Sequence, residues 1–139
     1  MKIFVTLLCT AVWLLSTQVF AQVPVTENPD HAAMLASDDP RLAKNKRLVY
    51  DMWRTLLEAR QLDQADKFMA EDYIQHNPAV ATGRKAFVDF FSRFGGGPRE
   101  LQDRIAAKLV AIVAEGDLVV LSFARELEHL SGLLVRKAE

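Results

Sequence analysis

Apolar positions recur with two different periods along this chain, and the change of period divides it. From about residue 38 to residue 59 they recur at spacings of three and four, which predicts an amphipathic helix. The members of this apolar stripe are Leu48, Val49, Met52, Trp53 and Leu56. Asp39 is expected to cap the helix, and Pro40 suits its first position, where a missing N–H costs nothing.

Two more helices and a short strand are predicted next. Asp63 is expected to cap a short helix that continues to Met69. Residues 73–76 have the composition of a strand, which Pro78 would end because proline cannot continue a ladder. Residues 84–94 are predicted to form a third helix with an aromatic face made of Phe87, Phe90, Phe91 and Phe94. Core packing is the ordinary explanation of such a face.

The period shortens towards two after the flexible break at Gly95-Gly96-Gly97-Pro98. Within residues 101–114 the apolar parity changes near Leu109-Val110, which predicts a bulge or a strand buried on both faces. Glu115-Gly116-Asp117 is typical of a hairpin turn, and residues 118–123 follow as a second strand. This order predicts an α+β fold with helices packed on one face of a curved antiparallel sheet.

The N-terminal residues have the pattern of a secretory signal. A short positive start precedes residues 3–15, which are almost wholly apolar but shorter than the roughly 20 residues that span a bilayer. Val19 and Ala21 suit a signal peptidase. We therefore predict a signal peptide over residues 1–21 and a secreted or periplasmic protein with no stable membrane anchor after cleavage; an uncleaved anchor is the alternative. Residues 22–37, with two prolines, are predicted to be a flexible arm, and residues 38–139 to form the domain.

The composition limits the kinds of reaction and partner to be expected of this chain. The chain has 139 residues, half of them hydrophobic and a quarter charged, which fits one globular domain. Cys9 is its only cysteine and would leave with the signal, so no disulfide or thiol nucleophile is expected. Seventeen basic residues face 18 acidic ones without a basic cluster, which argues against nucleic acid as a partner.

His76 is the candidate catalytic residue. The segment Tyr73-Ile74-Gln75-His76-Asn77-Pro78 brings an imidazole, a phenol and two amides together beside apolar residues. Histidine exchanges a proton near neutral pH, so His76 is a candidate acid–base group. The alternative is a structural histidine bonded to the backbone. His31 and His129 complete no metal-ligand spacing with it, so no metal is expected.

Several segments, in this order, resemble a SnoaL-like polyketide cyclase domain of the nuclear-transport-factor-two-like superfamily. Besides the first helix, they are Asp63-x-Ala-x-Lys-Phe-Met, Glu71 to Pro78, Gly83-Arg84-x-x-Phe87 and Ala114 to Val120. The resemblance implies a cone of helices against a strongly bent antiparallel sheet, a cystatin-like barrel with a pocket in its concavity. Relatives on this fold include aldol-type cyclases, ketosteroid isomerase and scytalone dehydratase. They work by acid–base chemistry without a metal or an organic cofactor.

The resemblance also implies a function. His76 matches the histidine of the family's strand-end motif, and Tyr73 matches the aromatic residue before it. We expect a cofactor-free cyclase, isomerase or lyase that acts on a small hydrophobic carbonyl compound. The expected pocket residues are Trp53, Tyr73, Phe90, Phe91 and Phe123, with Arg125 at the rim. The alternatives are a non-catalytic module that binds a small ligand and an inactive, truncated domain.

The C-terminal segment departs from the family. The family continues after the hairpin with further long strands, which residues 131–139 do not resemble. Two strands are therefore expected to be missing, through truncation or a frame shift after about Glu126, or because a partner completes a shortened variant. A sheet that lacks strands exposes an apolar edge, and a homodimer is one way to cover it.

Overall fold

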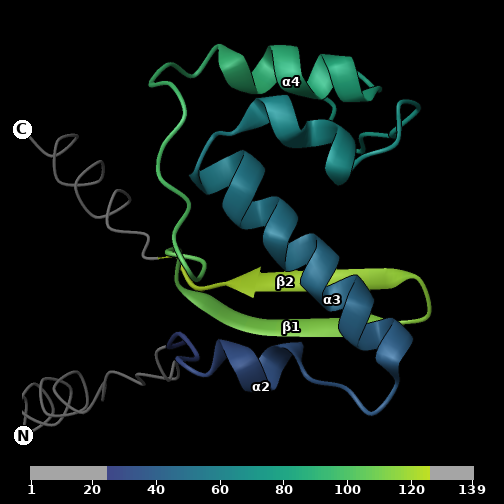
Figure 1. Cartoon of the computed structure of the whole chain (residues 1–139), viewed down its shortest axis with the longest axis vertical. Coiled ribbons are helices and arrows are strands. Elements are labelled where there is room, and N and C mark those ends of the chain that lie inside the picture. Colours follow the sequence, from purple (N-terminus) through teal and green to yellow (C-terminus); the bar gives the residue numbers. More distant parts are fainter. Residues whose placement is uncertain (1–24, 126–139) are drawn as a thin grey trace, which may run out of the picture.

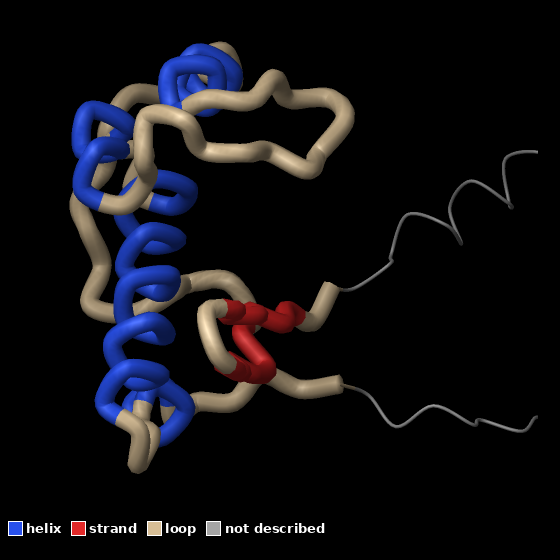
Figure 2. The backbone as a smooth tube through the Cα atoms, turned by 90° about the vertical axis from the view of Figure 1, so that its right-hand side faces the viewer, coloured by secondary structure: helices blue, strands red, loops and turns tan. Residues whose placement is uncertain are grey.

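Helices and one antiparallel hairpin make up residues 25–125, the part of the chain that the computed structural model describes (Figure 1). The elements are α2 (His31–Leu35), α3 (Pro40–Met52), the π-helix η1 (Trp53–Glu58), the 3-10 helix η2 (Leu62–Lys67), α4 (Arg84–Ser92), β1 (Leu109–Glu115) and β2 (Leu118–Phe123). In Figure 2 the helices stand on one side of the hairpin, and the loop between η2 and α4 projects in the same direction as the hairpin. The predicted α+β fold, with helices against a curved antiparallel sheet, is confirmed.

The long helix begins where the sequence predicts. The Asp39 side chain accepts a hydrogen bond from the Arg41 backbone N–H at 2.8 Å, and Pro40 is the first helical residue. At Trp53 the helix continues into η1, where the Ala59 N–H donates to the Arg54 carbonyl, five residues earlier, at 2.8 Å. Arg60, at φ 54°, follows the end of η1.

This continuous helix connects two hydrophobic cores. The first, which we call the hairpin core, consists of Leu35, Tyr50, Ile105, Leu109 and Ile112. The second, the helical core, consists of Leu56, Ala65, Met69 and Phe87. Figure 1 shows the reason for this division: α3 crosses the hairpin, whereas η2 and α4 cover the other end of the helix.

The hairpin confirms the local predictions made for it. Its two strands pair in antiparallel register, with an irregularity between Leu109 and Ala111, where the change of parity predicts a bulge. Gly116 forms the turn with a positive φ of 56°, which glycine adopts without a steric penalty. Alternate residues of β2 pack on the hairpin core; these are Val119, Leu121 and Phe123. The opposite face of the hairpin is apolar but exposed, at Val113, Leu118 and Val120.

The segment predicted as a flexible arm contains α2 instead. Asp30 caps this short helix by accepting the Ala33 N–H at 2.9 Å, and Leu35 is buried in the hairpin core. Before it, the Asn28 N–H donates to the Leu109 carbonyl at 2.8 Å. Lys46 of α3 donates to the backbone carbonyls of residues 34 and 36. These contacts come from distant parts of the chain, so the local pattern did not reveal them.

The predicted strand over residues 73–76 does not form. This segment belongs to the loop between η2 and α4, where the Tyr73 carbonyl accepts the Gly83 N–H at 2.7 Å. Asn77 closes a turn there by accepting the Val80 N–H at 3.0 Å. The two ends of this loop are bonded to one another. Among residues 25–125, the segment therefore has no neighbouring strand to pair with. Likewise, residues 101–108 are irregular, and the strand begins only at Leu109.

Two helix details also differ from the prediction. Asp63 lies inside η2 rather than at its cap, since η2 begins at Leu62 and no side chain caps it. Leu48 is exposed, whereas Tyr50, which the predicted stripe omits, is buried in the hairpin core. The helix presents Tyr50 and Trp53 to the hairpin, and Leu48 lies outside that face.

The predictions for residues 1–21, for His129 and for the chain beyond Glu126 concern residues outside the described part. Within residues 25–125, no helix is both long and apolar enough to cross a membrane.

Candidate functional site

Trp53 and Phe123 form the part of the predicted pocket that the structure brings together. Trp53 is the first residue of η1, and Phe123 is the last residue of β2. Their rings stack with centroids 4.4 Å apart and planes 27° apart, and both pack against the hairpin core. Two residues far apart in the sequence therefore build one aromatic surface between the helix and the sheet.

The Trp53 indole has an unusual feature. Its Nε1 is buried and has no hydrogen-bond acceptor among the described residues. Buried side-chain donors are nearly always paired, so an unpaired one requires an explanation. An indole N–H can only donate, so a group that pairs with it must bring an acceptor atom.

Two of the other predicted pocket residues pack on the helical core. Tyr73 meets Phe87 edge to face at a centroid distance of 6.1 Å, and Phe91 packs on Phe87 at 4.5 Å. Phe90 contacts Phe91 on α4 and also Phe94, which lies beyond the end of α4 at Ser92 and not inside the helix as predicted. Arg125 is exposed beyond the end of β2. The predicted pocket is thus divided into a Trp53–Phe123 pair at the hairpin core and an aromatic group at the helical core.

His76 lies exposed on the loop between η2 and α4. No hydrogen bond, ion pair or ring contact joins it to another residue of the described part. Its ring is accessible to solvent, and neither a carboxylate nor a backbone group there fixes its orientation. Its catalytic role stays a prediction.

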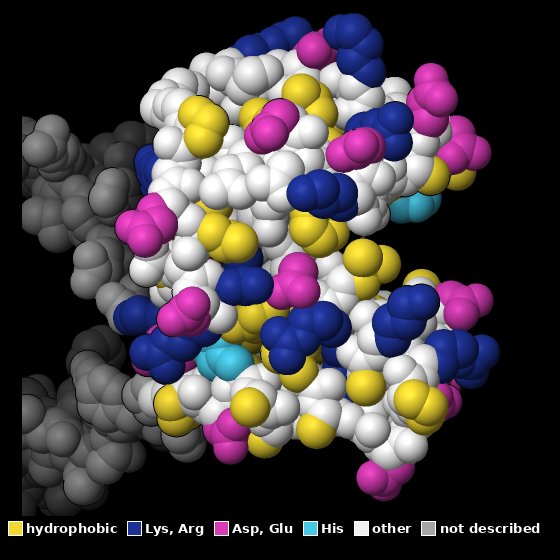
Figure 3. Space-filling model, viewed as in Figure 1, with side chains coloured by type: hydrophobic (Ala, Val, Ile, Leu, Met, Phe, Trp, Pro, Cys, Tyr) yellow, Lys and Arg dark blue, Asp and Glu magenta, His cyan; other side chains and the backbone are white. Residues whose placement is uncertain are grey.

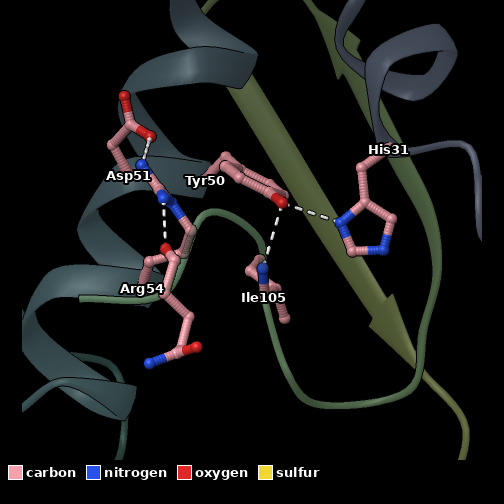
Figure 4. Close-up of polar contacts among 6 residues, drawn as sticks. His31, Tyr50, Asp51, Arg54 and Ile105 are labelled. Atoms are coloured by element: carbon pink, nitrogen blue, oxygen red, sulfur yellow. Dashed lines mark hydrogen bonds and ion pairs between the residues drawn. The ribbon is translucent and has the colours of Figure 1, made fainter. Parts of the chain in front are cut away.

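A second polar group, which the sequence did not suggest, surrounds Tyr50 (Figure 4). The Tyr50 hydroxyl is hydrogen-bonded to His31 Nδ1 at 2.7 Å and accepts the Ile105 N–H at 3.0 Å. The Arg54 guanidinium lies over the Tyr50 ring, 5.4 Å from its centroid, and is paired with Asp51 at 2.8 Å. These contacts hold α2 and the segment before β1 against α3. The only indication of this polar group in the local sequence was that Tyr50 and Trp53 are three residues apart.

The chemistry of the described surface is mixed. On the face shown in Figure 3, positive and negative side chains are interspersed. Among residues 25–125, no group of three or more His, Cys, Asp and Glu side chains could hold a metal ion.

Comparison with known proteins places the chain in a family. A family model described as a SnoaL-like domain matches residues 49–132, more than half of the chain. No curated protein and no solved structure matches it. The match includes the end of α3, η1, the loop that carries His76, α4 and both strands, so it covers every predicted site residue. The chain therefore belongs to the SnoaL-like domain family, within the nuclear-transport-factor-two-like superfamily.

Proposed function

We propose that this domain binds a small hydrophobic compound through an acceptor oxygen, such as a carbonyl, at the Trp53–Phe123 pair. The SnoaL-like domain is a fold of cofactor-free isomerase- or cyclase-type proteins and of ligand-binding proteins. The observation that carries the proposal is the buried, unpaired Nε1 of Trp53. If residues 1–21 act as the predicted signal peptide, binding takes place outside the cytoplasm.

The physical argument concerns the cost of the unpaired donor. A buried N–H without an acceptor destabilises a protein by about 1–3 kcal/mol. A ligand oxygen would supply the missing acceptor, and the stacked rings, with Leu121 beside them, would supply apolar contact area. Sites for small molecules commonly combine apolar walls with a few placed polar groups. Because Nε1 is covered, a neighbouring side chain must move; Phe123, at the end of β2, can do so without breaking the strand pairing inside the hairpin.

The geometry favours binding over catalysis by His76. A general acid or base must lie within hydrogen-bond reach of the reacting group and be held in orientation. His76 is exposed and has no orienting partner in the described part of the chain, whereas the aromatic pair packs against the hairpin core. We therefore propose a ligand-binding domain whose affinity does not depend on His76.

A matched pair of ligands tests the role of the indole N–H. In a full-length Trp13→Phe background, Trp53 is the only tryptophan, so its fluorescence reports on the site alone. Titration with a bicyclic ketone such as tetralone should change the Trp53 emission and raise the unfolding temperature. The hydrocarbon tetralin should bind about tenfold more weakly, since it lacks the oxygen that accepts the hydrogen bond.

Substitutions then separate the contribution of the indole N–H from those of the aromatic ring and of His76. Trp53→Phe keeps an aromatic ring but removes the N–H, so thermal shift should show weaker ketone binding and unchanged tetralin binding. His76→Ala should leave both unchanged. Equal affinity of the wild type for ketone and hydrocarbon would contradict the proposed hydrogen bond. Turnover of the ketone that His76→Ala abolishes would instead establish the catalytic alternative.

A further inference from the structure

Two hollows meet at the C-terminal end of η1, away from the Trp53–Phe123 pair. The first has a volume of about 260 Å³, and its lining is apolar apart from Arg60: Leu56, Leu57, Leu62, Phe91 and Phe94. Phe94 is 58% exposed, so an aromatic ring faces solvent at the rim of this groove. The other apolar side chains of the lining are half-buried, except Leu56, which is buried.

The second hollow, of about 360 Å³, shares Leu57 and Arg60 with the first and is also lined by Arg54 and Arg99. Arg60 Nη1 and Arg99 Nη2 lie 3.8 and 3.9 Å from the point where a Cβ of Gly96 would stand. Both guanidinium groups therefore lie beside the glycine. Neither side chain has a hydrogen bond or an ion pair with another residue of the described part.

Two carboxylates share the lining of this hollow with the arginines. Glu58 lines the same hollow, but its carboxylate accepts the backbone N–H groups of Ala106 and Ala107 at 2.9 and 3.0 Å. Arg54 is paired with Asp51, and Glu100 is the second acidic side chain of the lining. Within the described residues neither Glu58 nor Glu100 forms an ion pair with Arg60 or Arg99, so the N–H donors of both guanidinium groups are free for a ligand.

Arg60 has a backbone conformation that costs conformational free energy. Its φ of 54° is uncommon for a residue with a side chain. The neighbouring residues fix it: the Arg99 N–H donates to the Ala59 carbonyl at 2.7 Å, and the Gln61 N–H donates to the Thr55 carbonyl at 2.9 Å. Strained backbone of this kind concentrates at functional sites.

We propose that this composite groove binds a small amphipathic carboxylate. The carboxylate lies between Arg60 and Arg99, and the apolar body lies along Leu57, Leu62 and Phe94. Guanidinium groups bind carboxylates with two parallel hydrogen bonds, which makes arginine suited to this role. An inorganic anion would leave the apolar hollow unused, and a neutral hydrocarbon would leave both arginines unpaired.

Octanoate and octanol form a matched pair of probes. Isothermal titration of the full chain, below the critical micelle concentration of octanoate, should show octanoate binding at least tenfold more tightly than octanol or inorganic phosphate. Arg99→Gln and Arg60→Gly should each weaken octanoate binding about tenfold and leave octanol binding unchanged. Phe94→Ser should weaken both, because it removes apolar contact.

Controls separate the role of the side chain from that of the fold. Glycine adopts a positive φ freely, so Arg60→Gly should not lower the unfolding temperature, and its loss of binding would be due to the guanidinium. Arg41→Gln removes an exposed charge of α3 and should change nothing. Trp53→Phe should also leave octanoate binding intact, which distinguishes this groove from the proposed ketone site.

Three results would overturn the proposal. Equal affinity for octanol and octanoate would reduce the groove to an apolar contact. Equal affinity for phosphate and octanoate would reduce it to an anion site without use of the apolar hollow. Failure of the folded wild-type chain to bind octanoate would reject it directly.

Discussion

Tyr50 has only 1% of its surface exposed, although its side chain ends in a hydroxyl. The burial is possible because both neighbours of the hydroxyl are polar: the ring of His31 on α2 and the backbone N–H of Ile105 before β1. One side chain therefore joins three segments that are distant in the sequence. The apolar pattern of α3 did not single it out, since the partners of the hydroxyl lie outside the helix.

Removal of this hydroxyl should be costly. Tyr50→Phe leaves the Ile105 N–H buried without its acceptor, so we expect the free energy of unfolding to fall by about 1–3 kcal/mol. Urea denaturation of the full chain measures this change. Tyr73→Phe is the control, because the Tyr73 hydroxyl has no hydrogen bond within the described part. Equal effects of the two substitutions would show that the hydrogen bonds of Tyr50 contribute nothing particular.

At the scale of elements, the start of α3 is determined by residues that lie next to it in the sequence. Asp39 and Pro40 are adjacent to the helix they begin, and they act there through their own backbone and side-chain geometry. The same holds for the hairpin, whose turn and bulge follow from neighbouring residues.

The cap of α3 gives a test at this scale. Asp39→Ala removes the acceptor of the Arg41 N–H and should lower the free energy of unfolding by about 0.5–2 kcal/mol. Asp38→Ala removes the same charge one residue earlier, from an exposed side chain, and should have little effect in the same thermal or urea unfolding experiment. A larger loss for Asp38→Ala would mean that the cap is misassigned.

Elements that depend on distant contacts could not be predicted in this way. α2 is too short to form from its own propensity and is held by Leu35, Asn28 and Lys46. The segment over residues 73–76 has the composition of a strand, yet its ends close a loop. The candidate sites follow the same rule: the family resemblance pointed to Trp53 and Phe123, but Arg60 and Arg99 come to lie beside Gly96 only in the folded chain.

At the scale of the whole molecule, two cores share one helix. α3 contributes Tyr50 to the hairpin core, and η1 contributes Leu56 to the helical core. Since this helix is continuous, the loss of one core should disturb the other, and we expect the described domain to unfold in a single transition.

Leu109, whose surface is fully buried at 0% exposure, provides the test. Leu109→Ala should lower the free energy of unfolding by about 2–5 kcal/mol. In the Trp13→Phe background, Trp53 fluorescence reports on the hairpin core and far-UV circular dichroism on the helices; the two transitions should shift together. Leu101→Ala, at a site 40% exposed, should stay within about 0.5 kcal/mol of the parent. Earlier loss of the Trp53 signal would show that the hairpin core unfolds on its own.

The outer face of the hairpin is the surface relevant to self-association. Val113 and Val120 are directly opposite in the strand register, and both are exposed together with Leu118. Apolar pairs of this kind on a sheet surface favour association with another apolar face. The homodimer expected from the sequence stays a prediction, and this face is where we would introduce a charge, such as Val120→Lys, to prevent it.

The π-helical turn η1 also determines how far the residues after it are rotated about the helix axis. Each residue of an α-helix advances the side-chain direction by about 100°, whereas a π-turn spreads one revolution over more residues. The residues after Trp53 therefore point in directions that a regular α-helix would not give them. The direction of Arg60, which follows η1, is changed in the same way. If the same six residues of η1 formed a regular α-helix, everything beyond the turn would be rotated about the helix axis. Helical content would hardly change, yet Arg60 would no longer lie beside Gly96, so this turn determines which surface Arg60 joins.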